Sequence, residues 1–116
     1  MSDGREKRRY KRMRKPLTIE FREAGGEKDK WSLGAVLNIG AGGVLFYHNE
    51  EIRLGAELEL RFSLNETDIV CRGKVIREEQ IPHMSFSAIV FTDIDEKYKE
   101  AISSAAEKFH PEPLND

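Results

Sequence analysis

Most of the chain alternates between apolar and polar residues, the pattern of strands that bury one face. The alternation begins at Leu17 and recurs in six runs, which short polar or glycine-containing stretches separate. In the clearest run, apolar residues hold every second position: Leu58, Leu60, Phe62 and Leu64. The six runs cover about 17–22, 31–39, 44–47, 57–64, 69–77 and 84–91. Six short strands at close spacing favour a closed or nearly closed antiparallel barrel, because closure removes exposed edges.

The second run carries the first polar residue of interest. Strict alternation puts one set of residues on a common inward face: Trp31, Leu33, Ala35, Leu37 and Ile39. Asn38 then falls on the opposite, outward face near the end of this strand.

A corner with three glycines in four positions follows, at Gly40, Gly42 and Gly43. Glycine accepts a positive φ and lacks a Cβ, so these residues permit a tight turn and close approach by a ligand. Successive N–H groups in such a turn can converge on an anion. The alternative is a plain hairpin whose glycines serve only the turn.

The period changes from two to that of a helix after residue 92. Asp93 and Glu96 have the spacing of a capping box, and an apolar stripe follows: Tyr98, Ala101, Ile102, Ala105 and Phe109. We therefore predict one domain in four parts, whose helix packs on the barrel or on a partner. The parts are a basic arm (1–16), a β-barrel (17–94), a C-terminal helix (95–109) and a tail (110–116).

Charge is distributed unevenly along the chain. The net charge is only -2, but residues 1–16 hold eight basic and two acidic residues, which leaves +6 on the arm and -8 on the rest. Crowded like charges and Pro16 disfavour a helix here, so we expect a flexible arm that a ligand or the barrel orders. Phosphate is the expected partner chemistry; a solubilising arm and nonspecific attraction to nucleic acid are the alternatives.

Composition limits the class of protein. With 116 residues, 39% apolar and 34% charged, the chain predicts one soluble domain. No run approaches the ~18 apolar residues of a membrane span, and the charged N-terminus does not resemble a signal peptide, so we expect a cytoplasmic protein. The single cysteine, Cys71, excludes an internal disulfide and is expected to be a buried small hydrophobe.

Catalytic motifs are scarce. His48, His83 and His110 are dispersed, so we expect no metal site. No Gly-x-Ser-x-Gly motif is present, and the glycine corner has neither the lysine of a Walker loop nor the following helix of a dinucleotide fingerprint. The sequence therefore favours a binding protein over an enzyme.

Two motifs together resemble a known family. Arg8-x-x-x-Arg12 precedes the first strand, and Asn38-x-Gly40-x-x-Gly43 closes the second. They resemble the two-part signature of PilZ domains, an Arg-x-x-x-Arg arm and an Asp/Asn-x-Ser-x-x-Gly turn. The resemblance runs from about residue 7 to residue 109 and includes the strand order and the C-terminal helix.

This resemblance implies a mainly β protein, a six-stranded antiparallel PilZ-like β-barrel with a C-terminal α-helix. It also implies a noncatalytic bacterial receptor that needs no cofactor. Such domains bind the second messenger cyclic di-GMP and pass the signal to another domain or protein.

The resemblance also assigns ligand-binding residues. Arg8 and Arg12 become guanine and phosphate ligands, and Asn38, Gly40 and Gly43 form the opposing surface. A guanidinium group can address guanine O6 and N7 together, stack on a base or pair with phosphate, and an amide can donate and accept at a base edge. Arg9 adds a stacking or phosphate contact, or stays solvated.

One position departs from the family pattern. Gly40 stands where the family has serine, and the missing neutral hydrogen bond contributes roughly 0.5 to 1.5 kcal/mol, so we expect binding weakened by about tenfold. Three functions stay open: a cyclic di-GMP receptor whose arm orders on binding, a degenerate PilZ-like protein-interaction module that does not bind the nucleotide, and nonspecific nucleic-acid binding by the arm. The first is preferred and nucleic acid is disfavoured.

Overall fold

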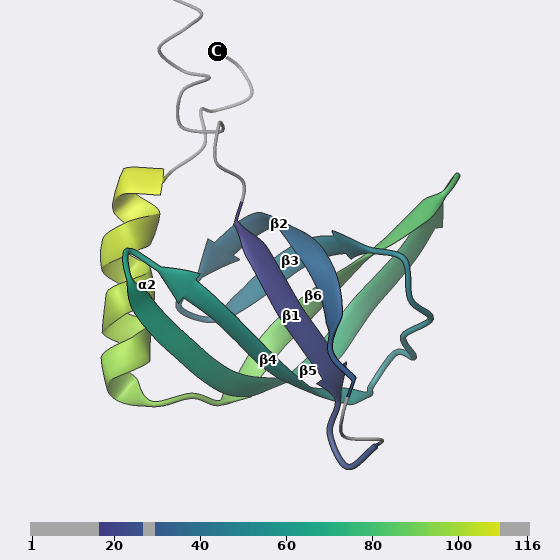
Figure 1. Cartoon of the computed structure of the whole chain (residues 1–116), viewed down its shortest axis with the longest axis horizontal. Coiled ribbons are helices and arrows are strands. Elements are labelled where there is room, and N and C mark those ends of the chain that lie inside the picture. Colours follow the sequence, from purple (N-terminus) through teal and green to yellow (C-terminus); the bar gives the residue numbers. More distant parts are fainter. Residues whose placement is uncertain (1–16, 27–29, 110–116) are drawn as a thin grey trace, which may run out of the picture.

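The computed structural model describes residues 17–26 and 30–109, with side chains described to residue 105. The predicted arm and tail lie outside the described residues. Six strands and one helix follow one another along the chain (Figure 1). They are β1 (Thr18–Glu23), β2 (Ser32–Gly40), β3 (Gly43–His48), β4 (Glu57–Leu64), β5 (Thr67–Ile81), β6 (Met84–Asp93) and α2 (Glu96–Phe109).

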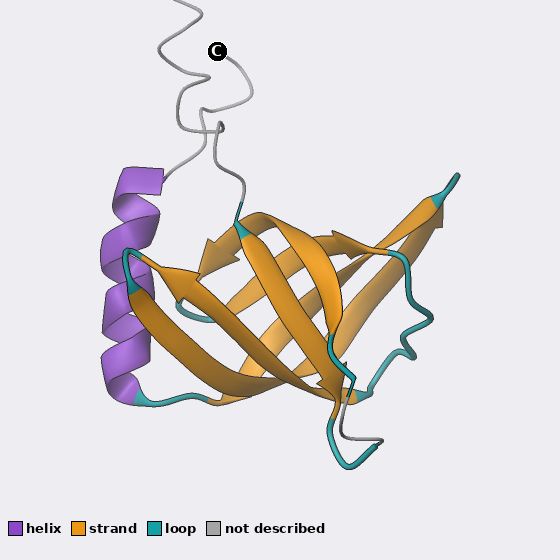
Figure 2. Ribbon diagram, viewed as in Figure 1, coloured by secondary structure: helices purple, strands orange, loops and turns teal. Residues whose placement is uncertain are grey.

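The strands form a closed antiparallel barrel in the order β1-β2-β3-β6-β5-β4. Figure 2 shows the strands wrapping around one interior, with α2 standing beside the barrel. The predicted fold class is confirmed. Alternation produces this closure, because each strand then presents one apolar row inward and one polar row outward.

The core fills the barrel interior and continues beneath the helix. Its largest fully buried apolar side chains come from five elements: Ile19, Phe46, Leu60, Ile69, Val75 and Ile102. α2 packs against β2 and β4, with Ile102 and Ala105 buried and Tyr98 partly buried. The apolar stripe therefore packs on the barrel over the helical residues whose side chains are described; the side chain of Phe109 is not among them.

The barrel has two ends that differ in what surrounds them. We call the first the helix end; it holds the start of β1, the β2–β3 and β4–β5 hairpins, the end of β6 and α2 (Figure 1). We call the other the pocket end; it holds the β1–β2 connection, the 49–56 loop and the β5–β6 hairpin. This separation decides which residues can share a site.

The predicted inward face of β2 is wrong for its first half. Leu33 and Ala35 are exposed, whereas Gly34 and Val36 are buried. Only glycine fits the inward position 34, because a Cβ on Gly34 would lie well under 3 Å from the Phe46 ring. A glycine gives no hydrophobic signal, so the apolar pattern of the sequence is one residue out of phase with the true inner face of this half of β2.

Two predicted boundaries are also wrong. The fifth strand does not end near residue 77, because β5 continues to Ile81 and pairs with β6 as a two-stranded ribbon that turns at Pro82 and His83. His83 has a positive φ of 74°. The helix cap is Asp95 rather than Asp93: Asp95 Oδ1 accepts the N–H of Lys97 at 3.1 Å, and Asp93 is the last residue of β6.

Candidate functional site

The β2–β3 hairpin carries every described residue of the predicted site. Gly40 pairs with Gly43 across the turn, and Asn38 pairs with Leu45. The register shifts between Val36 and Asn38, so one extra residue is inserted into β2. Without this bulge, Asn38 would follow the buried Val36 onto the inner face. The bulge returns Asn38 to the outside, where its side chain is exposed.

Gly40 and Gly43 serve different purposes in this hairpin. A Cβ on Gly43 would lie well under 3 Å from the carbonyl oxygen of Ile89, so Gly43 lets β3 and β6 approach closely. A Cβ on Gly40 would have no heavy atom within 4 Å. Gly43 is therefore needed for packing, and Gly40 leaves open space at the position where the resemblance expects a serine.

The glycine corner turns without a positive φ at Gly40, Gly42 or Gly43. Among the described glycines, only Gly25 and Gly55 have a positive φ. The turn is instead tied to the neighbouring strand, because the carbonyl of Gly42 accepts the N–H of Phe91 at 2.9 Å. The hairpin that carries Asn38 is thus anchored to β6.

The chain enters the barrel beside this hairpin. The carbonyl of Leu17 accepts the N–H of Val36 at 2.8 Å, two residues before Asn38 along β2. Arg8, Arg9 and Arg12 lie outside the described residues. Arg12 is five residues before Leu17 and Arg8 nine, so an extended chain places their Cα atoms at most about 18 Å and 32 Å from Leu17.

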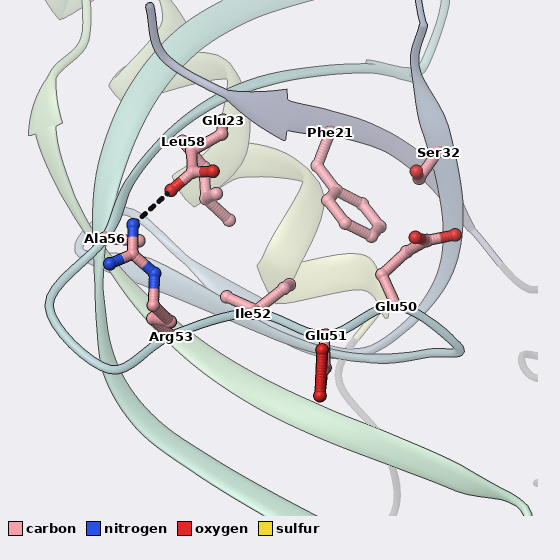
Figure 3. Close-up of a pocket in the computed structure, with 9 residues that line it drawn as sticks. All are labelled: Phe21, Glu23, Ser32, Glu50, Glu51, Ile52, Arg53, Ala56 and Leu58. Carbon is pink, nitrogen blue, oxygen red and sulfur yellow. Dashed lines mark hydrogen bonds and ion pairs between the residues drawn. The ribbon is translucent and has the colours of Figure 1, made fainter. Parts of the chain in front are cut away.

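A cavity of about 180 Å³ lies at the pocket end, away from this hairpin. Figure 3 shows Phe21 and Ile52 reaching into the opening, whereas the Glu51 carboxylate points away from it. Arg53 pairs with Glu23 at 2.9 Å on its rim. The lining residues are Phe21, Glu23, Ser32, Glu50, Glu51, Ile52, Arg53, Ala56 and Leu58. None of the three predicted site residues that the structure describes, Asn38, Gly40 and Gly43, lines this cavity.

Two features of the described residues bear on catalysis: the grouping of metal-ligating side chains and the state of the Cys71 thiol. No group of three His, Cys, Asp or Glu side chains in residues 17–26 and 30–105 comes together as a metal site. Cys71 is buried as predicted, and burial raises the pKa of its thiol to about 12, so the thiolate needed for nucleophilic attack does not form near neutral pH.

None of the helices within the described part of the chain has the length and apolar character to cross a membrane.

Sequence reasoning missed one buried polar cluster at the pocket end. His48, Ser87 and Glu78 join three separate segments by hydrogen bonds. The available signal was weak: Ser85 and Ser87 alternate along the last strand, and both are buried. Nothing in the spacing of these residues placed them next to His48, because β6 pairs with β3 through the barrel topology.

Comparison with known proteins gives one family-model match and similar solved structures. The family model described as PilZ domain matches residues 6–107. The inhibitor of motility (MotI/DgrA) of Bacillus subtilis is structurally similar, with a TM-score of 0.69 and 19% identity over 88% of this chain. The chain spans about half of that protein, 49% of its length. Comparison with curated proteins returned no match.

A second solved structure covers nearly the same region. The PilZ domain of CeSA from a cellulose-synthesizing bacterium aligns with a TM-score of 0.58 and 16% identity. The alignment covers 83% of this chain and 95% of that domain. At these identities, the structural likenesses establish the barrel fold and its helix.

Proposed function

The chain belongs to the PilZ domain family, and from this premise we propose that it is a noncatalytic, cytoplasmic cyclic di-GMP receptor. In this proposal the N-terminal arm orders over the β2–β3 hairpin when the nucleotide binds. PilZ domains are generally receptors that bind this messenger and interact with effectors, so the expected output is an altered contact with a protein effector.

One observation carries the proposal: the arm joins the barrel next to Asn38. The hydrogen bond between Leu17 and Val36 fixes the starting point of the arm two residues from Asn38. The span of about 18 Å from Leu17 to Arg12 is a maximum, so the arginine can fold back to this hairpin without distorting the barrel. Had β1 begun at the pocket end, the same arm would have had to cross the barrel's length.

The side-chain chemistry of the arm and of the β2–β3 hairpin suits a cyclic dinucleotide. Arg8 and Arg12 supply planar cations that pair bidentately with guanine O6 and N7 or with phosphate. Asn38 supplies one exposed amide that donates and accepts. The anionic ligand also relieves the repulsion among the eight basic residues of the arm. Arg9 is the further contact, to a base face or a phosphate.

A second candidate function rests on Gly40. The family's serine hydroxyl is absent, so one hydrogen bond worth roughly 0.5 to 1.5 kcal/mol is missing. A chain that had lost more of its affinity would act as a PilZ-like interaction module independent of the nucleotide. Its effector contact would then be insensitive to cyclic di-GMP and to both motif arginines.

Isothermal titration calorimetry with cyclic di-GMP tests the proposal. Wild-type protein should bind, and Arg8→Ala or Arg12→Ala should each weaken binding by about tenfold to a hundredfold, because a charged hydrogen bond contributes roughly 1.5 to 3 kcal/mol. Arg53→Ala is the matched control. It removes the same charge from an exposed position at the pocket end, and its affinity should equal that of wild type.

The pattern across the variants separates the functions. No heat from the wild type at high protein concentration contradicts the receptor and supports the interaction module. Equal losses from Arg12→Ala and Arg53→Ala would show that binding follows net charge, as nonspecific phosphate attraction requires.

A further inference from the structure

One histidine at the pocket end is fully buried, although its imidazole ring is polar. His48 ends β3, and its side chain has 0% exposed surface. Its ring packs against the rings of Phe21 and Phe46, with centroid distances of 5.5 Å to each. A polar ring in apolar surroundings must satisfy its nitrogens internally.

Hydrogen bonds to both ring nitrogens define the tautomer. The backbone N–H of Glu50 donates to Nδ1 at 3.1 Å, so Nδ1 carries no proton. Nε2 lies 2.8 Å from Ser87 Oγ and is therefore the donor in that contact. The Ser87 hydroxyl in turn donates to the Glu78 carboxylate. Each proton in this chain points toward Glu78, and neutral His48 satisfies every group.

This chain of bonds joins the 49–56 loop to the β5–β6 ribbon. Glu50 belongs to the loop, Glu78 to β5 and Ser87 to β6. The loop also forms one wall of the cavity through Glu50, Glu51, Ile52 and Arg53 (Figure 3). His48 thus holds the Glu50 end of the cavity wall to the barrel, and the Arg53–Glu23 pair holds the other end.

A second proton on His48 cannot be accommodated without losing one of these bonds. It must bind Nδ1, which faces the N–H donor of Glu50. The charged groups near the ring are Glu78 from β5 and Glu50 from the loop, whereas β1 and β6 present Phe21 and Ser87. Burial lowers the pKa of His48 from its usual 6.5, and Glu78 and Glu50 raise it to a lesser degree.

We propose that His48 is a proton-operated latch, and that adding a proton releases the Glu50 end of the 49–56 loop from the barrel and widens the cavity at the pocket end. The far end of the loop stays tied to Glu23 through Arg53 and to Val75 through Gly55 and Ala56. The Glu50 N–H loses its acceptor, while the new imidazolium keeps Glu78 as its counter-ion. The folded pKa lies below the unfolded value, so the latch is fully stabilising above about pH 6.5 and its contribution is lost as pH falls below that value. This device does not depend on the nucleotide or on the arm.

Nuclear magnetic resonance of the intact chain tests the latch. The ring nitrogens of His48 and the hydrogen exchange of the Glu50 amide are followed from about pH 8 to about pH 5. At high pH the ring should be the Nε2–H tautomer and the Glu50 amide should be protected. As pH falls from about 6.5 toward the His48 midpoint, protection relative to the intrinsic exchange rate should fall by about tenfold per pH unit, and it should level off below that midpoint. The Leu60 amide in the barrel serves as the internal reference and should stay protected.

Two variants make the test specific. His48→Asn keeps an acceptor near the Nδ1 position but does not titrate, so protection at Glu50 should not vary with pH. His83→Asn removes an exposed histidine from the ribbon tip and should leave the transition unchanged; asparagine also tolerates the positive φ found there. If His48→Asn does not fold, Ser87→Ala replaces it. That variant retains the bond from Glu50 to Nδ1, and the transition should persist.

Three results would overturn the proposal. The first is protonation of His48 with unchanged protection at Glu50. The second is a ring that stays neutral until the whole barrel unfolds, seen as simultaneous loss of protection at Leu60. The third is an Nδ1–H tautomer at high pH.

Discussion

The two ends of the barrel use polar side chains in opposite ways. At the helix end, Asn38 is exposed on a bulged strand, and open space surrounds the Cβ position of Gly40. At the pocket end, His48 is buried, and both of its ring nitrogens have partners. An exposed amide keeps its hydrogen-bonding capacity for a ligand, whereas a satisfied buried network stabilises the chain around it. Recognition is therefore expected at the first end and conformational control at the second.

The largest expected effect separates packing from recognition within the hairpin itself. Gly43→Ala should lower the free energy of unfolding by roughly 1 to 3 kcal/mol, because its Cβ would collide with the Ile89 carbonyl. Gly40→Ala should change it by less than about 0.5 kcal/mol, because open space receives the methyl group. Urea denaturation measures both. Equal losses would contradict the different roles assigned to the two glycines.

The next effect probes the buried network. Ser87→Ala leaves the Nε2–H of His48 without its hydroxyl partner and should cost about 1 to 3 kcal/mol of unfolding free energy. Ser63→Ala removes an exposed hydroxyl that bonds Asp68 at 2.5 Å, and it should cost less than about 0.5 kcal/mol. A small loss at Ser87, matching that at Ser63, would mean that the network does not stabilise the pocket end.

A gain of affinity is expected at the helix end. Gly40→Ser restores the family's hydroxyl in open space, where the backbone needs no positive φ. Cyclic di-GMP affinity should rise by up to about tenfold, the equivalent of one neutral hydrogen bond. Gly42→Ser places the same side chain in equally open space two positions further along the turn and should leave affinity unchanged. An equal gain from both variants would show that position 40 has no special place in the site.

The smallest effect is expected on the barrel wall between the ends. Arg22 and Arg61 each make a cation-π contact with Trp31. Their guanidinium carbons lie 4.1 Å and 4.0 Å from the centre of its ring. Arg61→Met should destabilise the fold by about 0.5 to 1 kcal/mol and shift the emission of Trp31, the single tryptophan. Arg61 also pairs with Glu20, and Arg72→Met removes a comparable pair with Glu59 from the barrel surface, so in this control the emission should not change.

Sequence predicted the fold wherever inward positions carried large apolar residues. β4 is the clearest example, because Leu58, Leu60, Phe62 and Leu64 are all buried as expected. β2 failed for a local reason: Gly34 marks its inner face without a side chain, and a bulge then shifts the phase before Asn38. The outward position of Asn38 was predicted correctly, although an unbroken alternation was the wrong reason for it.

In the candidate site, too, features set by local sequence were predictable, whereas features set by strand pairing were not. The glycine corner was visible from local spacing, but the different roles of Gly40 and Gly43 depend on β6, a strand more than 40 residues away in sequence. The bond from Leu17 to Val36 and the contact of His48 with Ser87 depend equally on strand pairing. Arg8, Arg9 and Arg12 stay predictions, because they lie outside the described residues.

The central claim is that the nucleotide brings the arm to the β2–β3 hairpin, and paramagnetic relaxation tests it directly. Met13→Cys carries a spin label on the arm, next to Arg12, and Cys71 does not compete because it is buried and protonated. The account predicts that cyclic di-GMP broadens the amide signals of Asn38 and Gly43 and leaves Glu51 at the pocket end unchanged. Broadening at Glu51, or none at Asn38 from a protein that calorimetry shows to be saturated with the nucleotide, would contradict it.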